Sequence, residues 1–128
     1  MTFICYPKCT TCQKARKWLD ENGIAYALRD IKAEKPAYDE LAAWRKRSGL
    51  PLKKFFNTSG LLYKSMELKD RLPDMSEEEM LRLLASDGML VKRPFLVDDD
   101  FVLVGFKEAE WDGVLKAQQP KRFEKTKE

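Results

Sequence analysis

The chain has 128 residues, 44% of them hydrophobic and 35% charged, which is enough for one folded domain with a buried core. Its net charge of +3 is too small to indicate nucleic-acid binding, and its complete lack of histidine excludes Cys-His and Ser-His catalytic pairs and imidazole metal ligands. Neither a membrane span of ~20 apolar residues nor the basic start of a signal peptide is recognisable, so we expect a cytoplasmic protein.

A β-α-β unit is predicted at the start of the chain. Residues 2–6 are short, apolar and followed by Pro7, so they predict a strand. From Thr10 to about Asn22 the apolar residues recur at spacings of three and four, which predicts an amphipathic helix. Residues 25–31 predict a second strand, which should be parallel to the first because such crossovers are right-handed.

Helices are predicted to fill most of the region from about residue 36 to residue 90. The first runs from Asp39 to Arg47 and turns Leu41 and Trp44 inward. A short apolar piece over residues 50–56 follows, and the turn-forming residues 57–60 end it.

A later helix in this region has a clear start signal. Ser76 and Glu79 have the spacing of a capping box, in which each side chain bonds to the backbone N–H of the other residue. Met80, Leu83 and Leu84 are expected to form the buried stripe of this helix.

The last part of the chain predicts two strands and a helix. Residues 95–97 and 101–104 are apolar runs joined by three aspartates, which predicts an antiparallel hairpin. A final helix is expected over residues 107–115. We therefore expect a single domain over residues 1–117, followed by a charged and frayed tail over residues 118–128.

This element order is that of the thioredoxin-like fold, an α/β fold with a mixed four-stranded sheet and, here, a helical insertion over about residues 36–90. The motif C-T-T-C over residues 9–12 lies between the first strand and the first helix, where that fold has its C-x-x-C active site. Pro94 stands just before the third strand, where the fold has a proline that is usually cis.

All three cysteines lie in the first twelve residues. Cys9, at the start of the helix, should be the nucleophile, because the helix dipole, free N–H groups and Lys8 favour its thiolate. Cys12 lies one turn inside and is the predicted resolving thiol. The alternative is that both are small core residues. Cys5 lies on the strand and is interpreted as packing, and a zinc site would lack a fourth ligand.

Arg93 precedes Pro94, and in this fold the loop before the proline lies against the C-x-x-C turn. Its guanidinium could therefore stabilise a thiolate or an oxyanion substrate, although a surface arginine is the alternative. The turn over residues 57–60 offers polar groups that could bind an anion, while an ordinary turn is the favoured interpretation. The predicted substrate-binding group consists of Lys8, Thr10, Thr11, Asn57 and Pro94.

Four segments spread over the chain up to about residue 116 resemble the arsenate-reductase-like (ArsC/Spx) family: C-T-T-C-Q-K-A-R-K-W-L, F-F-N-T-S-G-L-L-Y, L-L-A-S-D-G-M-L-V-K-R-P and V-L-V-G-F-K-E. For one branch, the glutaredoxin-linked arsenate reductases, the resemblance implies a cysteine that attacks arsenate, glutathione that then forms a mixed disulfide, and three arginines that hold the oxyanion. Cys9 matches the nucleophile and Arg93 one arginine. Asn57 and Gly105 stand at the other two arginine positions, so inefficient arsenate turnover is expected. Those reductases also commonly lack a thiol at the position of Cys12.

The other branch contains the Spx regulators, in which a C-x-x-C switch controls binding to the C-terminal domain of the RNA polymerase α subunit. Cys9, Cys12, Arg93 and Gly105 resemble that branch. The segment F-F-N-T-S-G resembles instead the uncharacterised reductase-like members, which the chain matches best overall.

We therefore predict a thiol-disulfide oxidoreductase that reduces arsenate or a related small substrate. In this prediction Cys9 attacks, Cys12 resolves and Arg93 stabilises negative charge. The alternative is a redox-sensing regulator that binds the polymerase α subunit. No bound cofactor or metal is expected. An external thiol (glutathione, glutaredoxin or thioredoxin) should restore the dithiol, and no direct contact with nucleic acid or membrane is expected.

Overall fold

The structure, a computed structural model, describes residues 1–118 and contains a mixed four-stranded sheet. The strands are β1 (Thr2–Cys5), β2 (Ala27–Asp30), β3 (Phe95–Val97) and β4 (Val102–Val104), in the order β2-β1-β3-β4. β1 pairs with β2 in parallel, whereas β1 with β3 and β3 with β4 are antiparallel. The predicted thioredoxin-like sheet is confirmed. Apart from residue 118, the predicted tail lies outside the described residues.

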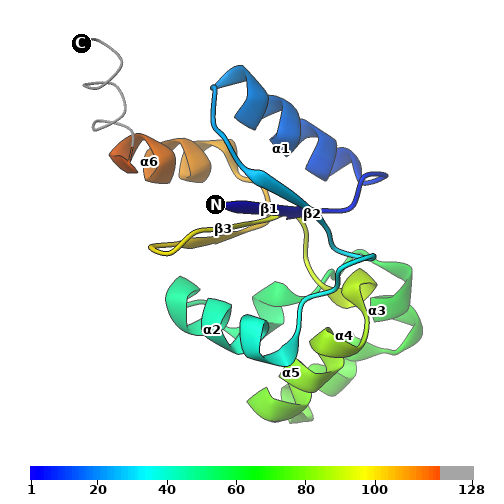
Figure 1. Cartoon of the computed structure of the whole chain (residues 1–128). Coiled ribbons are helices and arrows are strands. Elements are labelled where there is room, and N and C mark those ends of the chain that lie inside the picture. The colour runs from blue at the N-terminus through cyan, green and yellow to red at the C-terminus, as the bar shows by residue number, and fades with distance from the viewer. Residues whose placement is uncertain (119–128) are drawn as a thin grey trace, which may run out of the picture.

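Helices cover both faces of this sheet (Figure 1). One face is covered by α1 (Thr10–Glu21) and α6 (Glu108–Gln118). The other is covered by the insertion, which consists of α2 (Tyr38–Ser48), α3 (Leu61–Ser65), α4 (Leu68–Arg71), α5 (Glu77–Ser86) and the short 3₁₀ turns Leu52–Phe55, Leu72–Asp74 and Gly88–Leu90. None of the helices within residues 1–118 is long and apolar enough to cross a membrane.

The alternation of side chains along β1 divides the core into two clusters. Phe3 and Cys5 are buried against α1 and α6, together with Leu19 and Trp111. Ile4 points to the opposite face and joins the cluster under the insertion. The direction of Cys5 is therefore set by the pleat of β1, which turns its thiol toward α1.

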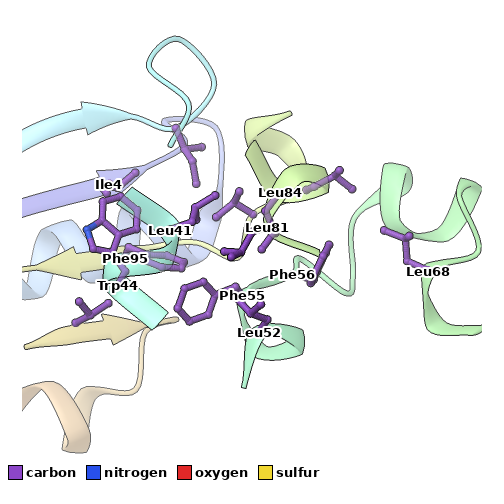
Figure 2. Packing of buried hydrophobic residues seen from close by; sticks show 14 of the residues in the cluster. Ile4, Leu41, Trp44, Leu52, Phe55, Phe56, Leu68, Leu81, Leu84 and Phe95 are labelled. Carbon is purple, nitrogen blue, oxygen red and sulfur yellow. The ribbon is translucent and has the colours of Figure 1, made fainter. Parts of the chain in front are cut away.

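The second cluster fills the space between the sheet and the insertion (Figure 2). The ring of Phe95 on β3 lies 5.2 Å from that of Phe55 and 5.7 Å from that of Trp44, measured between ring centres. Leu41 and Trp44 on α2 are buried as predicted.

The structure confirms the capping box of α5 but changes the buried face of this helix. The Ser76 hydroxyl accepts a 3.1 Å hydrogen bond from the Glu79 N–H, and the Glu79 carboxylate accepts one of the same length from the Ser76 N–H. Leu81 and Leu84 are buried, whereas Met80 and Leu83 are only half-buried, so the predicted stripe was partly wrong. The reason is that α5 packs against both α2 and the 3₁₀ turn before residue 56, which rotates the buried face toward Leu81.

Other differences from the predictions concern the ends of elements. β2 is shorter than the expected 25–31, because its ladder with β1 starts at Ala27, and α6 extends past residue 115. The short helix α3 was not predicted from the sequence.

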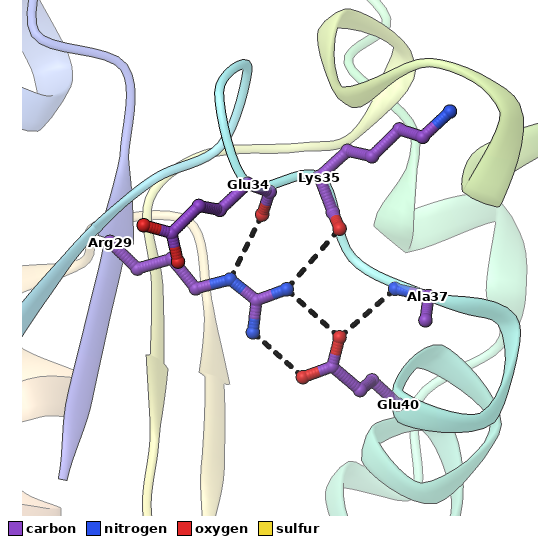
Figure 3. A network of polar contacts seen from close by, with 5 residues as sticks. All are labelled: Arg29, Glu34, Lys35, Ala37 and Glu40. Atoms are coloured by element: carbon purple, nitrogen blue, oxygen red, sulfur yellow. Dashed lines mark hydrogen bonds and ion pairs between the residues drawn. The ribbon is translucent and has the colours of Figure 1, made fainter.

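A network of polar contacts around Arg29 fixes the connection from β2 to α2 (Figure 3). The Arg29 guanidinium donates to both carboxylate oxygens of Glu40, at 2.7 and 2.8 Å, and to the carbonyl oxygens of Glu34 and Lys35. Its hydrogen bonds hold the pKa of Glu40 below the ordinary value. The guanidinium of Arg29 and the carboxylate of Glu40 thus form a bidentate ion pair, which fixes the conformation of the loop between β2 and α2.

This loop reaches the rim of the site described below. The Asp30 carboxylate accepts hydrogen bonds from the N–H groups of Lys32 and Ala33, at 2.8 and 3.2 Å. Gly88 packs directly against the carbonyl group of Ile31, where a β-carbon would collide with the carbonyl oxygen. The end of the insertion and the loop after β2 are therefore in close backbone contact.

Candidate active site

Cys9 lies at the first turn of α1 as its N-cap residue. The turn that leads into the helix is closed by a 2.9 Å hydrogen bond from the Cys9 N–H to the carbonyl oxygen of Tyr6. The Cys9 thiol caps no backbone N–H as an ordinary N-cap side chain would, and the residue is half-buried. The N–H groups of Thr11 and Cys12 point to its sulfur. Because α1 has no serine or aspartate as its N-cap, the unpaired N–H groups of its first turn face the sulfur of Cys9.

The electrostatic surroundings of Cys9 favour its thiolate. Burial of the sulfur alone would raise the pKa of Cys9. The Cys12 N–H, the Arg93 guanidinium, the Cys12 thiol and the Thr11 N–H outweigh this effect and lower the pKa of Cys9 below the ordinary thiol value. The result is a partly accessible sulfur with thiolate character, as a nucleophile requires.

Arg93 reaches Cys9 from the opposite side of the site. The peptide bond between Arg93 and Pro94 is cis, which confirms the prediction for Pro94. The guanidinium carbon lies 5.2 Å from the centre of the Tyr6 ring, and Nη1 lies 4.0 Å from the sulfur of Met89. Within residues 1–118 this guanidinium forms no ion pair with a carboxylate. Its charge is therefore directed to the thiol of Cys9.

Cys12 lies behind Cys9 and is only 2% exposed. Its sulfur accepts a 3.3 Å hydrogen bond from the Tyr6 N–H, and its thiol is hydrogen-bonded to Cys9 on one side and Cys5 on the other. The hydrogen bond to Cys5, together with burial, raises the pKa of Cys12 strongly. Cys12 is thus the thiol that keeps its proton while Cys9 ionises. The contact of Cys5 with this pair was not predicted from the sequence, which indicated strand packing alone.

A cleft of about 780 Å³ opens over Cys9. Of the predicted residues, Cys9, Thr11, Asn57 and Arg93 line it, and so does Gly105. Three lysines that the sequence analysis did not single out also line it: Lys32, Lys92 and Lys107. Lys92 stands beside Arg93 in the sequence and Lys107 lies in the segment V-L-V-G-F-K-E, whereas Lys32 lies far from every segment quoted above and is brought to the cleft by the fold.

The other predicted residues lie outside the lining of this cleft. Lys8 and Thr10 are exposed on the outer side of the turn, and Cys12 is covered by Cys9. Pro94 is buried below the cleft, where its carbonyl oxygen accepts a 2.8 Å hydrogen bond from the Gly105 N–H. The structure therefore brings the nucleophile, one threonine, the asparagine and the arginine together, but not the full predicted group.

Asn57 and Gly105, the residues at the expected arginine positions, contribute no charge to the cleft. The Asn57 carboxamide accepts a 3.3 Å hydrogen bond from the Ser59 hydroxyl and packs on Gly60, so that it braces its own turn. Gly105 has a left-handed backbone conformation, with φ of 73°. The positive charge that lines the cleft therefore comes from one guanidinium and three lysine ammonium groups.

Within the part of the chain that the structure describes, no group of three or more His, Cys, Asp or Glu side chains is placed to hold a metal ion.

The sheet, the helices on both faces and a cis-proline loop opposite the first turn of α1 define a protein of the thioredoxin-like class. Comparison with family models is more specific: the ArsC family model matches residues 5–114, and the chain therefore belongs to the ArsC family.

Three similar proteins illustrate the range of this family. Uncharacterized protein YusI of Bacillus subtilis is 53% identical over 112 residues, which cover 88% of this chain and 95% of YusI. A solved ArsC family related protein from Bacteroides fragilis is 56% identical with a TM-score of 0.86, and the match covers 88% of this chain and 94% of that protein. The global transcriptional regulator Spx of Enterococcus faecalis is more distant, at 28% identity over 86% of this chain and 82% of Spx.

Proposed function

We propose that this chain is a thiol-disulfide oxidoreductase of the cytoplasm in which Cys9 is the nucleophile and Cys12 the resolving thiol. One observation carries the proposal: the guanidinium of Arg93, which lines an open cleft together with Cys9, and the buried thiol of Cys12 both act on the sulfur of Cys9. A charge that stabilises a thiolate and a second thiol that can displace an adduct are the two requirements of dithiol chemistry.

The reaction begins with attack of the Cys9 thiolate on an oxidised small substrate. With a disulfide substrate, the sulfur of Cys9 forms a mixed disulfide and expels one half of the substrate as a thiolate. Cys12 then attacks the sulfur of Cys9, expels the second half and transfers its own proton to it. Two electrons pass to the substrate, and a Cys9–Cys12 disulfide is left. Two equivalents of external thiol, or one dithiol of glutaredoxin or thioredoxin type, return these electrons.

Arsenate is a possible oxyanion substrate of the same steps. The Cys9 thiolate would displace one oxygen of arsenate as water, and attack of Cys12 on Cys9 would release the arsenic as arsenite. A single guanidinium with distributed lysines holds a tetrahedral oxyanion less firmly than several bidentate arginines do. We therefore infer slow turnover of arsenate.

The dimensions and lining of the cleft support an organic substrate. Its volume of about 780 Å³ falls in the range of ~300–1,000 Å³ that organic ligands occupy, which is far larger than an oxyanion needs. The walls include the apolar side chains of Leu62, Met89 and Phe106 beside the lysines. A small organic disulfide, including a mixed disulfide of glutathione, suits such a lining better than arsenate.

The test is a turnover assay of the full chain with two substrates: a neutral organic disulfide, and arsenate. Each is supplied with glutathione and glutaredoxin, and Cys9→Ser and Cys12→Ser are compared with the wild type. We expect both reductions to be lost in Cys9→Ser. In Cys12→Ser only the external thiol can remove the mixed disulfide on Cys9, so disulfide turnover should fall and depend on the glutathione concentration. The wild type should reduce arsenate slowly. Equal turnover by Cys9→Ser and the wild type would contradict the proposal.

A second candidate function is a redox-gated regulator that binds the C-terminal domain of the RNA polymerase α subunit. Similarity to Spx supports it, as does Leu61, a side chain that is 88% exposed and lines the same cleft as Cys9. Its test is a binding measurement with that polymerase domain in both redox states. Binding that depends on oxidation and is lost in Cys9→Ser supports a regulator. No binding in either redox state rules it out.

A further inference from the structure

The three cysteines form a continuous row in which Cys12 is the middle member. Cys5 is the last residue of β1, and its side chain points to the same face as Phe3, under the first turn of α1. The N–H of Tyr6, the residue directly after Cys5, donates to the sulfur of Cys12 at 3.3 Å. The Cys12 thiol is hydrogen-bonded to Cys5 as well as to Cys9. Cys12 is therefore positioned to bond with either neighbour.

We propose that Cys5 is a third redox-active thiol, which receives the disulfide from Cys9. The step follows the formation of the Cys9–Cys12 disulfide and therefore rests on the function proposed above. The sulfur of Cys5 attacks the sulfur of Cys12, a Cys5–Cys12 bond forms, and the Cys9–Cys12 bond breaks. Cys9 leaves as a thiolate and the proton of Cys5 is released, so no further oxidant is consumed.

The identity of the leaving group decides which sulfur of the Cys9–Cys12 disulfide is attacked. In thiol-disulfide exchange the thiol with the lower pKa leaves faster and is more stable as a free thiolate. The guanidinium of Arg93 and the N–H groups of the first turn of α1 lower the pKa of Cys9. The pKa of Cys5 is lowered as well, by its contact with Cys12, whereas the pKa of Cys12 is raised. Attack on the sulfur of Cys12 therefore releases the sulfur that the site stabilises best.

Burial favours the exchange. Cys5 is 4% exposed and Cys12 is 2% exposed, in the apolar cluster with Phe3 and Leu19. A neutral disulfide is well accommodated there, while a buried thiolate is costly. The exchange thus places the uncharged bond in the interior and the charge at the mouth of the cleft.

This relay changes the redox capacity of the protein. After the exchange, the thiolate of Cys9 is free to react with a second substrate molecule. That second adduct has no resolving thiol within the chain, so it must be removed by an external thiol. The inner disulfide is shielded from solvent and is reduced only by return of the bond to Cys9.

The first test counts the thiolates released from dithiobis(nitrobenzoate) in excess over the full chain. Resolution by Cys12 alone releases two nitrobenzoate thiolates for each chain. The relay frees Cys9 for one further reaction and releases a third. We expect three thiolates from the wild type and two from Cys5→Ala. Cys5→Val, which also lacks the thiol, is the matched control for loss of side-chain volume.

The second test locates the disulfide in the wild type and needs no variant. Lys8 separates the cysteines, so after alkylation trypsin yields Cys5 in residues 1–8 and both other cysteines in residues 9–14. For this mapping the chain is oxidised with one equivalent of the reagent. We expect the two peptides to be joined, with a free Cys9 that carries the alkyl label in the fragment spectrum.

Each outcome of the two tests has a distinct meaning. Joined peptides together with a third thiolate support the relay. A disulfide confined to residues 9–14 with two thiolates released overturns the relay but leaves the proposed function intact. A third thiolate that comes from a nitrobenzoate adduct on Cys5 also overturns it. If no disulfide forms and Cys9 reacts no faster than Cys5, the proposed function itself fails.

Discussion

The two faces of the sheet contribute different things to the cleft. On the face covered by α1 and α6, the three cysteine sulfurs come from one stretch of twelve residues, and the end of β1 and the first turn of α1 bring them together. On the other face, the insertion supplies cleft walls such as Asn57 and Met89, which are far from Cys9 in sequence. The chemistry is therefore local in the chain, whereas the surroundings of a substrate depend on the whole fold.

Replacement of Cys9, the proposed nucleophile, should have the largest effect on the reaction rate. For Cys9→Ser we expect the second-order rate with a neutral disulfide to fall by about 10³-fold or more, or roughly 4 kcal/mol in the barrier, because a serine hydroxyl is not activated at this position. Cys5→Ala, which leaves Cys9 and Arg93 in place, should retain the rate of the first step. Stopped-flow measurement of thiolate release compares the two variants. Similar losses in both would mean that the fold rather than the nucleophile was damaged.

The insertion on the other face of the sheet can be destabilised at its backbone contact with the loop after β2. Gly88→Ala places a methyl group against the carbonyl of Ile31 and should destabilise the protein by about 3 kcal/mol. Gly113→Ala in α6 is the control, because a β-carbon there has no neighbour within 4 Å. Gly113→Ala should raise the free energy of unfolding by about 0.5–1 kcal/mol, because alanine has the higher helix propensity. Urea denaturation measures the free energy of unfolding of both variants. If Gly88→Ala is as stable as the wild type, the backbone at Ile31 can move away from the added methyl group.

Arg93 connects the two faces, and its removal should change the pKa of Cys9. Because the guanidinium favours the thiolate, Arg93→Met should raise that pKa and, near neutral pH, slow alkylation of Cys9 about tenfold for each unit by which the pKa rises. Arg93→Lys should have a smaller effect, since it keeps the charge. Arg82→Met, which removes an exposed pair with Glu78 on α5, is the control. If the pH profile of Cys9 alkylation is unchanged in Arg93→Met, Arg93 does not stabilise the Cys9 thiolate.

The contact of Glu40 with Arg29 should give a smaller, pH-dependent effect. Because the pKa of Glu40 is lowered in the folded state, its stabilisation is complete above the unfolded value of about 4.3 and is lost as the pH falls through the folded value. Glu40→Gln should cost about 1 kcal/mol near neutral pH and less in acid. Glu21→Gln, which removes an exposed pair with Lys17, should cost close to nothing. Equal costs at neutral and acidic pH would contradict this assignment.

Much of the fold follows from local sequence patterns. The strand that ends at Pro7, the helix that starts at Thr10 and the capping box at Ser76 each depend on neighbouring residues, and each is observed. The buried face of α5 could not be assigned correctly, because packing against two neighbours decides which of several leucines is covered.

The candidate site was predictable to a lesser extent, for the same reason. Cys9 and Arg93 were identified because a helix start and a proline mark their positions in the sequence. The contact between Cys5 and Cys12 depends on how α1 lies across the end of β1, which no spacing along the chain reveals. Lys32 carries no local signal, because it is one of 24 basic residues and only the fold brings it to the cleft, whereas Lys92 directly precedes Arg93.

The central claim is that Cys9 alone among the three thiols is an accessible thiolate. The direct measurement is pulsed alkylation of the native chain with iodoacetamide over a range of pH, followed by mapping of each cysteine by mass spectrometry. We expect Cys9 to be labelled first, with a midpoint clearly below the ordinary thiol pKa of about 8.5, while Cys5 and Cys12 stay protected. A Cys9 midpoint at or above that value, or labelling of Cys5 at the same rate, would contradict it.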